Sequence, residues 1–153
     1  MKQYLGIFAA FVFLLQACSS GGSGSGLSDS QILGKWQITG VAVGESSMFH
    51  KNNKDIGSDE CVLKTVWEFT SEEAKALSDG TKTKKMMIVA PEECQHYSTD
   101  STWTIYNGRV FLTSSRIGGV GGISLAGQFK VNKVTATELE LFLSDVTISF
   151  KKI

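Results

Sequence analysis

Concentrated charge is missing from this sequence. Fifteen basic residues balance fifteen acidic ones among the 153 residues, and outside the last residues the longest basic run is Lys84-Lys85. A nucleic-acid partner is therefore not expected, because a phosphate backbone is bound by a dense basic surface. A disordered chain is also excluded, since the apolar content of 42% is ordinary and the net charge is zero.

Catalytic and cofactor motifs are missing as well. The sequence contains neither a Gly-x-Ser-x-Gly elbow nor a His-Glu-x-x-His pair. The glycine-rich segment 118–122 is not followed by Gly-Lys-Ser/Thr, so it does not predict a phosphate loop. The acidic segment 53–60 has its glycine and last glutamate at the wrong offsets for a calcium loop. We therefore expect a protein that is not an enzyme, with no catalytic residue and no cofactor.

No apolar run in the chain is long enough to cross a bilayer, which takes about 20 residues. The most apolar segment, residues 5–15, follows a single positive charge at Lys2. A positive start and a short apolar core are typical of a secretory signal peptide.

The residues after this core, Leu15-Gln16-Ala17-Cys18, resemble the lipobox of bacterial lipoproteins. The resemblance implies a signal peptide over 1–17 and acyl chains such as palmitate on Cys18, which anchor the mature protein in the membrane. Ser19 after the cysteine resembles the signal for the outer membrane, facing the periplasm. Residues 19–26 are all Ser or Gly and predict a flexible tether, so the folded domain spans 27–153. The alternative is an ordinary signal peptide with a cysteine at its cleavage site.

Two cysteines remain once Cys18 is assigned to lipid. Cys61 and Cys94 form an even pair in an oxidising compartment, which favours a disulfide. The alternative is a metal site that combines them with Glu92, Glu93, His96 and His50. We predict no metal site, because no Cys-x-x-Cys or His-x-x-x-His spacing sets the ligand geometry in advance.

Short alternating segments separated by Gly, Asn, Asp and Ser predict strands. Asn107-Gly108 joins two of these segments and is a strong hairpin signal. After a helical turn at 28–33, we expect eight strands at 34–43, 61–70, 84–90, 99–106, 109–115, 123–131, 138–143 and 146–151, with a short helix at 71–77. Successive strands with almost no helix predict an all-β, antiparallel up-and-down sheet that closes into a barrel.

The opening Gly34-Lys35-Trp36 resembles the Gly-x-Trp start of lipocalin-like proteins, in which the tryptophan closes the bottom of the barrel. A cysteine before each later tryptophan strand and the Asn-Gly hairpin continue the likeness to small lipocalin-like lipoproteins. Two features depart from that pattern: the connection 71–82 is long, and only Lys151 and Lys152 can replace the arginine that often covers the first tryptophan. The META-type sheet domain, which opens in a similar way, is an alternative topology.

The aromatic residues are the remaining candidate site. The resemblance implies a membrane-anchored envelope protein that binds a small hydrophobic molecule inside its barrel. An eight-stranded barrel is about wide enough to be filled by side chains or to hold one small ligand, so the same residues serve a packed core or a cavity. The alternative function is an envelope interaction or inhibitor protein with a filled core, acting through loops such as 44–60. The sequence identifies no protein partner. The candidate ligand-binding residues are Trp36, Trp67, Phe69, Trp103, Phe111 and Phe129.

Overall fold

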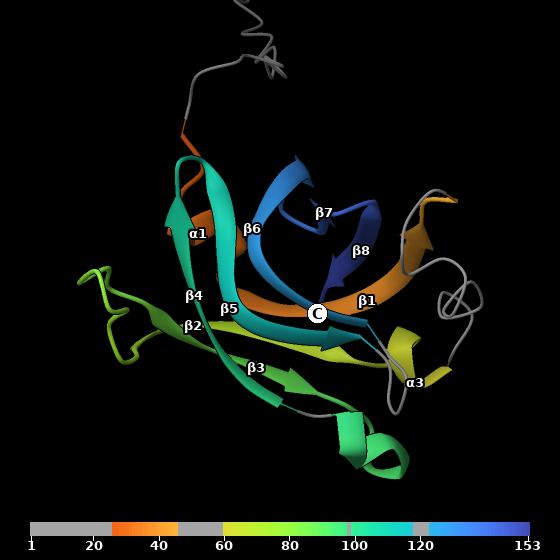
Figure 1. Cartoon of the computed structure of the whole chain (residues 1–153). Helices are drawn as coiled ribbons and strands as arrows, with labels where there is room; N and C mark the ends of the chain where they lie inside the picture. The colour runs from red at the N-terminus through yellow and green to blue at the C-terminus, as the bar shows by residue number, and fades with distance from the viewer. Residues whose placement is uncertain (1–25, 46–59, 98, 118–122) are drawn as a thin grey trace, which may run out of the picture.

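Eight antiparallel strands close into a barrel in which each strand pairs with the next and β8 pairs with β1 (Figure 1). The computed structural model describes residues 26–45, 60–97, 99–117 and 123–153, with the backbone alone at 95–97 and 116. The strands are β1 (Gly34–Val43), β2 (Val66–Glu73), β3 (Lys84–Val89), β4 (Thr99–Tyr106), β5 (Arg109–Ile117), β6 (Ile123–Val134), β7 (Glu138–Leu143) and β8 (Val146–Lys152). The predicted eight-stranded barrel is confirmed.

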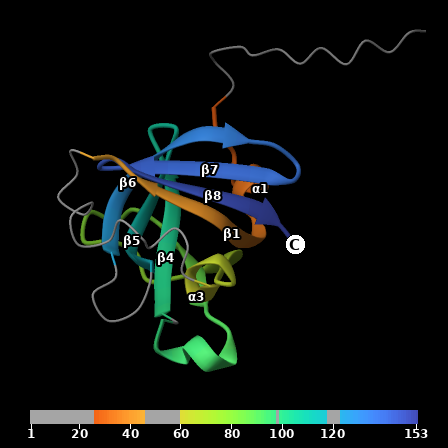
Figure 2. The same cartoon turned by 90° about the vertical axis from the view of Figure 1, so that its right-hand side faces the viewer.

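Three short helical segments accompany the strands: α1 (Asp29–Ile32), α3 (Glu60–Leu63) and the 3-10 segment η2 (Glu92–Tyr97). The predicted N-terminal helical turn is α1, which begins with a capping box between Ser28 and Gln31. In Figures 1 and 2, α1 lies at one end of the barrel and α3 lies well away from it. We call these ends the α1 end, where β1 begins and β8 finishes, and the disulfide end, which holds α3 and η2.

Alternating burial along the sequence explains why these segments form strands. In β7 and β8 every second residue is buried, from Leu139 and Leu141 to Val146, Ile148 and Phe150. This period of two places one set of side chains inside the barrel and the other outside.

Tight turns join neighbouring strands where the sequence allows a positive φ. Asn107 and Gly108 have φ values of 50° and 70° and connect β4 to β5, as the Asn-Gly signal predicts. Ser144 and Asp145 have φ values of 50° and 66° and form the corresponding turn between β7 and β8. Both turns match the twist of the strands that they join.

Two predictions around β2 were wrong. The strand expected at 61–70 begins at Val66, because residues 60–63 form α3 and bury Val62 in the core. The helix expected at 71–77 is absent from this described stretch. The strand β2 instead continues to Glu73, which pairs with Lys84 of β3. Cross-strand pairing therefore overrides the local helical preference of Glu72-Glu73-Ala74.

Candidate functional site

The interior of the barrel gathers five of the six predicted aromatic residues. Each has at most 1% of its surface exposed, and they come from four different strands. They are Trp36, Trp67, Phe69, Trp103 and Phe129. The Phe69 and Trp103 rings meet edge to face with centroids 5.4 Å apart, and Trp67 lies 5.1 Å from the Phe150 ring. Such contacts are favourable for aromatic rings and fill much of the space between the strands.

The three tryptophans differ in what their indole N–H groups bind. Trp36 Nε1 donates to the Ile32 carbonyl at 2.7 Å, and Trp103 Nε1 donates to the Thr70 carbonyl at 3.0 Å. Trp67 Nε1 is buried and has no hydrogen-bond partner among the described residues. Leaving a buried donor without an acceptor costs about 1–3 kcal/mol. The Trp67 indole N–H is therefore a buried donor that could hydrogen-bond to a ligand.

The α1 end is closed by lysines that lie over tryptophan rings. Lys152 Nζ lies 4.9 Å from the centroid of the Trp36 ring, so Lys152 takes the place expected for an arginine. Gly34 has φ +121°, and a Cβ there would come within 2.9 Å of Lys152 Cε. The Gly-x-Trp opening therefore provides both the ring and the space for the lysine stem that covers it.

A second lysine acts in the same way nearby. Lys84 Nζ lies 4.8 Å from the Trp103 ring centroid and 2.5 Å from Asp29 Oδ2 of α1. This ion pair joins α1 to the start of β3. Sequence reasoning missed it, because 55 residues separate the two partners and no local pattern connects them.

A disulfide between Cys61 and Cys94 ties α3 to η2 at the opposite end, as predicted, with their Cα atoms 5.8 Å apart. Thr65 Oγ1 donates to the Cys61 carbonyl at 2.6 Å, and Gln37 Nε2 donates to the Leu63 carbonyl at 3.0 Å. The Gln37 bond holds α3 against β1, the Thr65 bond closes the last turn of α3, and Val62 packs into the core.

Phe111 lies on the outside of the barrel, apart from the other five aromatics. Its neighbours on β5, Val110 and Leu112, are both buried, so Phe111 faces outward and is half-buried. It lines an external pocket of about 260 Å³ together with Tyr106 of β4 and Gln128 of β6. Aromatic character predicted an inward position, but the alternation along β5 decides the direction.

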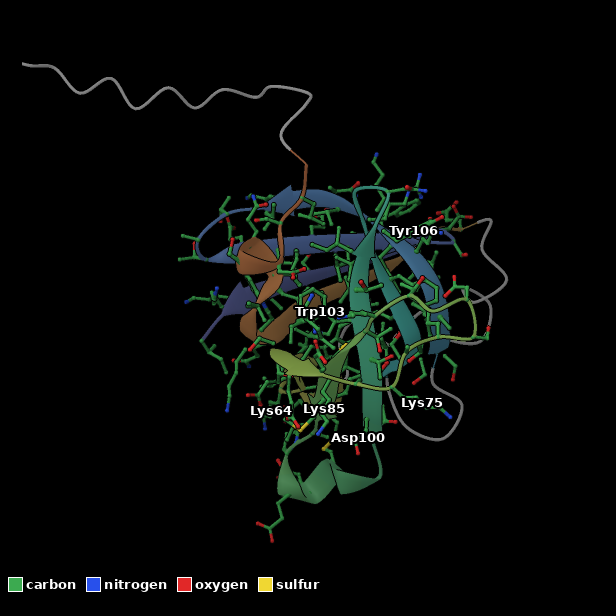
Figure 3. The ribbon with its side chains drawn as sticks, turned by 90° about the vertical axis from the view of Figure 1, so that its left-hand side faces the viewer. Lys64, Lys75, Lys85, Asp100, Trp103 and Tyr106 are labelled. Atoms are coloured by element: carbon green, nitrogen blue, oxygen red, sulfur yellow. A yellow bond between two sulfur atoms is a disulfide. The ribbon has the colours of Figure 1, made fainter. Side chains whose placement is uncertain are left out.

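Residues 74–83, which connect β2 to β3, cover this pocket from the outside. We call them the β2–β3 arm; Figure 3 shows it crossing β4 and β5. Within the arm, Asp79 Oδ1 accepts a hydrogen bond from the Thr81 backbone N–H at 2.9 Å. This bond lowers the pKa of the Asp79 carboxyl below its ordinary value, with smaller help from the Thr81 side chain. Asp79 therefore presents a carboxylate at the rim of the pocket.

Several predicted features lie outside the described residues. They are Cys18 with the segments 1–17 and 19–25, the loop 46–59 with His50 and most of the acidic segment, the glycine-rich segment 118–122, and the side chain of His96. Within the described ranges, no three His, Cys, Asp or Glu side chains are grouped to hold a metal ion. The helices of the same ranges are too short or too polar to span a membrane.

Comparison with known proteins gives one match. The sequence model of a family described as a lipocalin-like domain matches residues 32–141, from the end of α1 into β7. No curated protein and no solved structure gives a significant match. The matched region contains the Gly-x-Trp opening, the disulfide pair and all the predicted aromatic residues. The family and the closed barrel favour the lipocalin-like topology over the META-type alternative.

Proposed function

The chain belongs to the lipocalin-like domain family, and from that premise we propose that it binds one small, mostly apolar molecule inside its barrel. A barrel of eight strands suits small-molecule binding, since its interior is wide enough for one small ligand. The buried aromatic residues supply the apolar contacts that such a ligand needs.

The unpartnered N–H of Trp67 is the observation that carries this proposal. A ligand with one oxygen acceptor, such as a carbonyl, ether or hydroxyl group, would accept this hydrogen bond and remove the cost of the unmet donor. Trp36 and Trp103 already donate to backbone carbonyls, so neither needs a ligand. The proposed ligand is therefore an apolar molecule with an acceptor placed at Trp67.

We propose further that the protein is an envelope lipoprotein, anchored in the outer membrane through acylated Cys18 and facing the periplasm. The lipobox-like residues before Cys18 support this, and the disulfide fits an oxidising compartment. A Ser/Gly tether of eight residues has a mean span of about 15 Å. Because the tether leads into α1, the α1 end would lie near the membrane and the disulfide end would point away from it.

Native mass spectrometry of the full-length protein, expressed in its own host and then delipidated, tests the binding function. We expect a small molecule to co-purify with the wild type, and acyl mass to be present on Cys18 before delipidation.

The second candidate function is an envelope interaction protein with a filled core, favoured by the almost complete burial of the core side chains and their ring contacts. A protein that carries no molecule and binds no apolar probe would support this second candidate.

The indole N–H signals in a ¹⁵N NMR spectrum provide a sharper test, because the chain has only three tryptophans. We would compare 1-dodecanol, which carries an acceptor, with dodecane, which does not. We expect dodecanol to shift the Trp67 signal downfield and leave the Trp36 and Trp103 signals in place. Equal responses to both probes, or a response at Trp36 alone, would contradict the assignment of Trp67.

A further inference from the structure

The β2–β3 arm builds a pocket on the outside of the barrel that the proposed interior site does not use. The arm is held in shape by its own hydrogen bonds, with Leu77 N donating to the Thr81 carbonyl at 3.0 Å and Thr83 Oγ1 to the Lys75 carbonyl at 2.9 Å. It belongs to the long connection that the sequence shows between the second and third strands. The additional chain length therefore forms an ordered wall above the barrel surface.

The opposite wall is a row of residues across three strands. Thr104 of β4 pairs with Phe111 of β5, which pairs in turn with Gln128 of β6. Tyr106 lies two residues beyond Thr104 on the same face of β4 and is 48% exposed; Figure 3 labels it near the end of that strand. The strand register therefore brings two aromatic rings, a hydroxyl and an amide to one place.

The polar groups of this pocket are largely unused. Thr104 is 9% exposed, yet its hydroxyl has no hydrogen bond to any described residue. Within the same part of the chain, the Gln128 amide and the Tyr106 hydroxyl also have no hydrogen-bond partner. A larger hollow of about 450 Å³ lies on the other side of the arm, but there Lys85 and Glu72 pair with each other. The pocket at Thr104 is the better candidate for a neutral polar ligand, because the side chains of Thr104, Tyr106 and Gln128 line it and can both donate and accept hydrogen bonds.

We propose that this external pocket binds a neutral sugar ring. Each sugar hydroxyl both donates and accepts, so it matches the hydroxyls of Thr104 and Tyr106 and the amide of Gln128, which also do both. The C–H face of the ring would lie against the aromatic side chains, and the Asp79 carboxylate would accept from a hydroxyl at the rim.

Other ligand classes fit the pocket less well. A protonated amine only donates, so it would offer no acceptor to the N–H donors of Gln128. An anion would face the Asp79 carboxylate, which is the one charged side chain among the described residues that line the pocket. The volume of about 260 Å³ is below the usual range for drug-sized ligands and suits one ring.

Titration of the ¹⁵N- and ¹³C-labelled protein tests this proposal. The probes are D-glucose, D-galactose, D-mannose and N-acetyl-D-glucosamine, with ethanolamine and acetate as the charged alternatives. We expect at least one sugar to shift the Gln128 side-chain amide and the Thr104 methyl signals in a saturable way, with the three indole signals unchanged. No saturable shift with any sugar, or saturation at these signals by ethanolamine or acetate alone, would overturn the proposal.

Two variants identify the contacts. Gln128 is exposed, so Gln128→Leu should fold normally and should weaken sugar binding about fivefold or more through the loss of hydrogen bonds. Thr104→Val replaces the hydroxyl with a methyl group of similar size and should weaken binding to a similar extent. The matched control is Thr147→Val, a half-buried outward threonine on β8, which should bind as the wild type does. Unchanged binding in both folded pocket variants would contradict the assigned site.

Discussion

The two ends of the barrel are closed by different chemistry. At the α1 end, closure depends on an indole hydrogen bond from Trp36 to Ile32, four residues away, and on Lys152 over the same ring. At the disulfide end, closure depends on a covalent bond between cysteines that are 33 residues apart. One end is held by contacts that are mostly close in sequence or between paired strands, and the other by a bond between two connecting segments.

The two kinds of closure follow from the local structure at each end of the barrel. The α1 end has a helical turn directly before a paired strand, so Trp36 and Ile32 are brought together by local geometry. At the disulfide end, α3 and η2 are short helical segments in the connections between strands. Such segments bury little surface and gain most from a cross-link that restricts the unfolded chain.

Removing the disulfide should have the largest effect. For a 33-residue separation, the chain-entropy estimate for the double variant Cys61→Ser, Cys94→Ser is a loss of about 4 kcal/mol in the free energy of unfolding. Urea denaturation of the oxidised wild type and the variant measures this loss. Hydrogen exchange should quicken first at α3 and η2, while the α1 end stays protected. Uniform loss of protection at both ends would contradict the independence of the two closures.

The next largest loss of stability is expected on substitution of two tryptophans that face each other across β1 and β2. Trp36 and Trp67 are cross-strand partners and both are fully buried. Trp36→Phe loses ring contacts and a satisfied hydrogen bond, and should cost about 3 kcal/mol. Trp67→Phe loses similar contacts but also removes an unmet donor, so in ligand-free protein it should cost less by about 1 kcal/mol or more. Equal losses in urea denaturation would show that Trp67 has a partner in solution.

Much of the fold could be predicted from the sequence because alternation and turn chemistry act locally. The bounds of β1, β4 and β7 match the prediction, and the Asn107-Gly108 turn lies where the hairpin signal places it. The Gly34-x-Trp36 opening also indicates the closure of the α1 end. In each case the residues that decide the structure are neighbours along the chain.

Most of the rest depends on contacts between distant residues. The start of β2 could not be predicted, because the burial of Val62 and the link to Cys94 turn its first residues into α3. Phe111 was assigned to the interior from residue type, although the strand alternation at Val110 and Leu112 indicates the opposite direction. The external pocket needs the path of the β2–β3 arm, for which no local signal exists.

Adding one methyl group tests the glycine at the α1 end. Gly34→Ala must adopt φ +121° and displace the stem of Lys152, so we expect a loss of about 2 kcal/mol in the free energy of unfolding. Gly40→Ala is the matched control in the same strand, because a Cβ there has nothing within 4 Å and its φ needs no glycine. Equal stabilities of the two variants in urea denaturation would mean that Lys152 covers Trp36 without needing Gly34.

The smallest expected effect comes from the charge over Trp36. Lys152→Met keeps most of the apolar stem and removes the ammonium group, so the free energy of unfolding should fall by about 0.5–1 kcal/mol. Its control is Lys151→Met, since that exposed lysine points away from the ring. The fluorescence of Trp36, isolated in a Trp67→Phe, Trp103→Phe background, should change with the first substitution and not with the second. If both substitutions change stability equally, the α1 end is held by the hydrogen bond from Trp36 to Ile32 and by packing. Lys152 then contributes only the apolar contacts of its stem and not its charge.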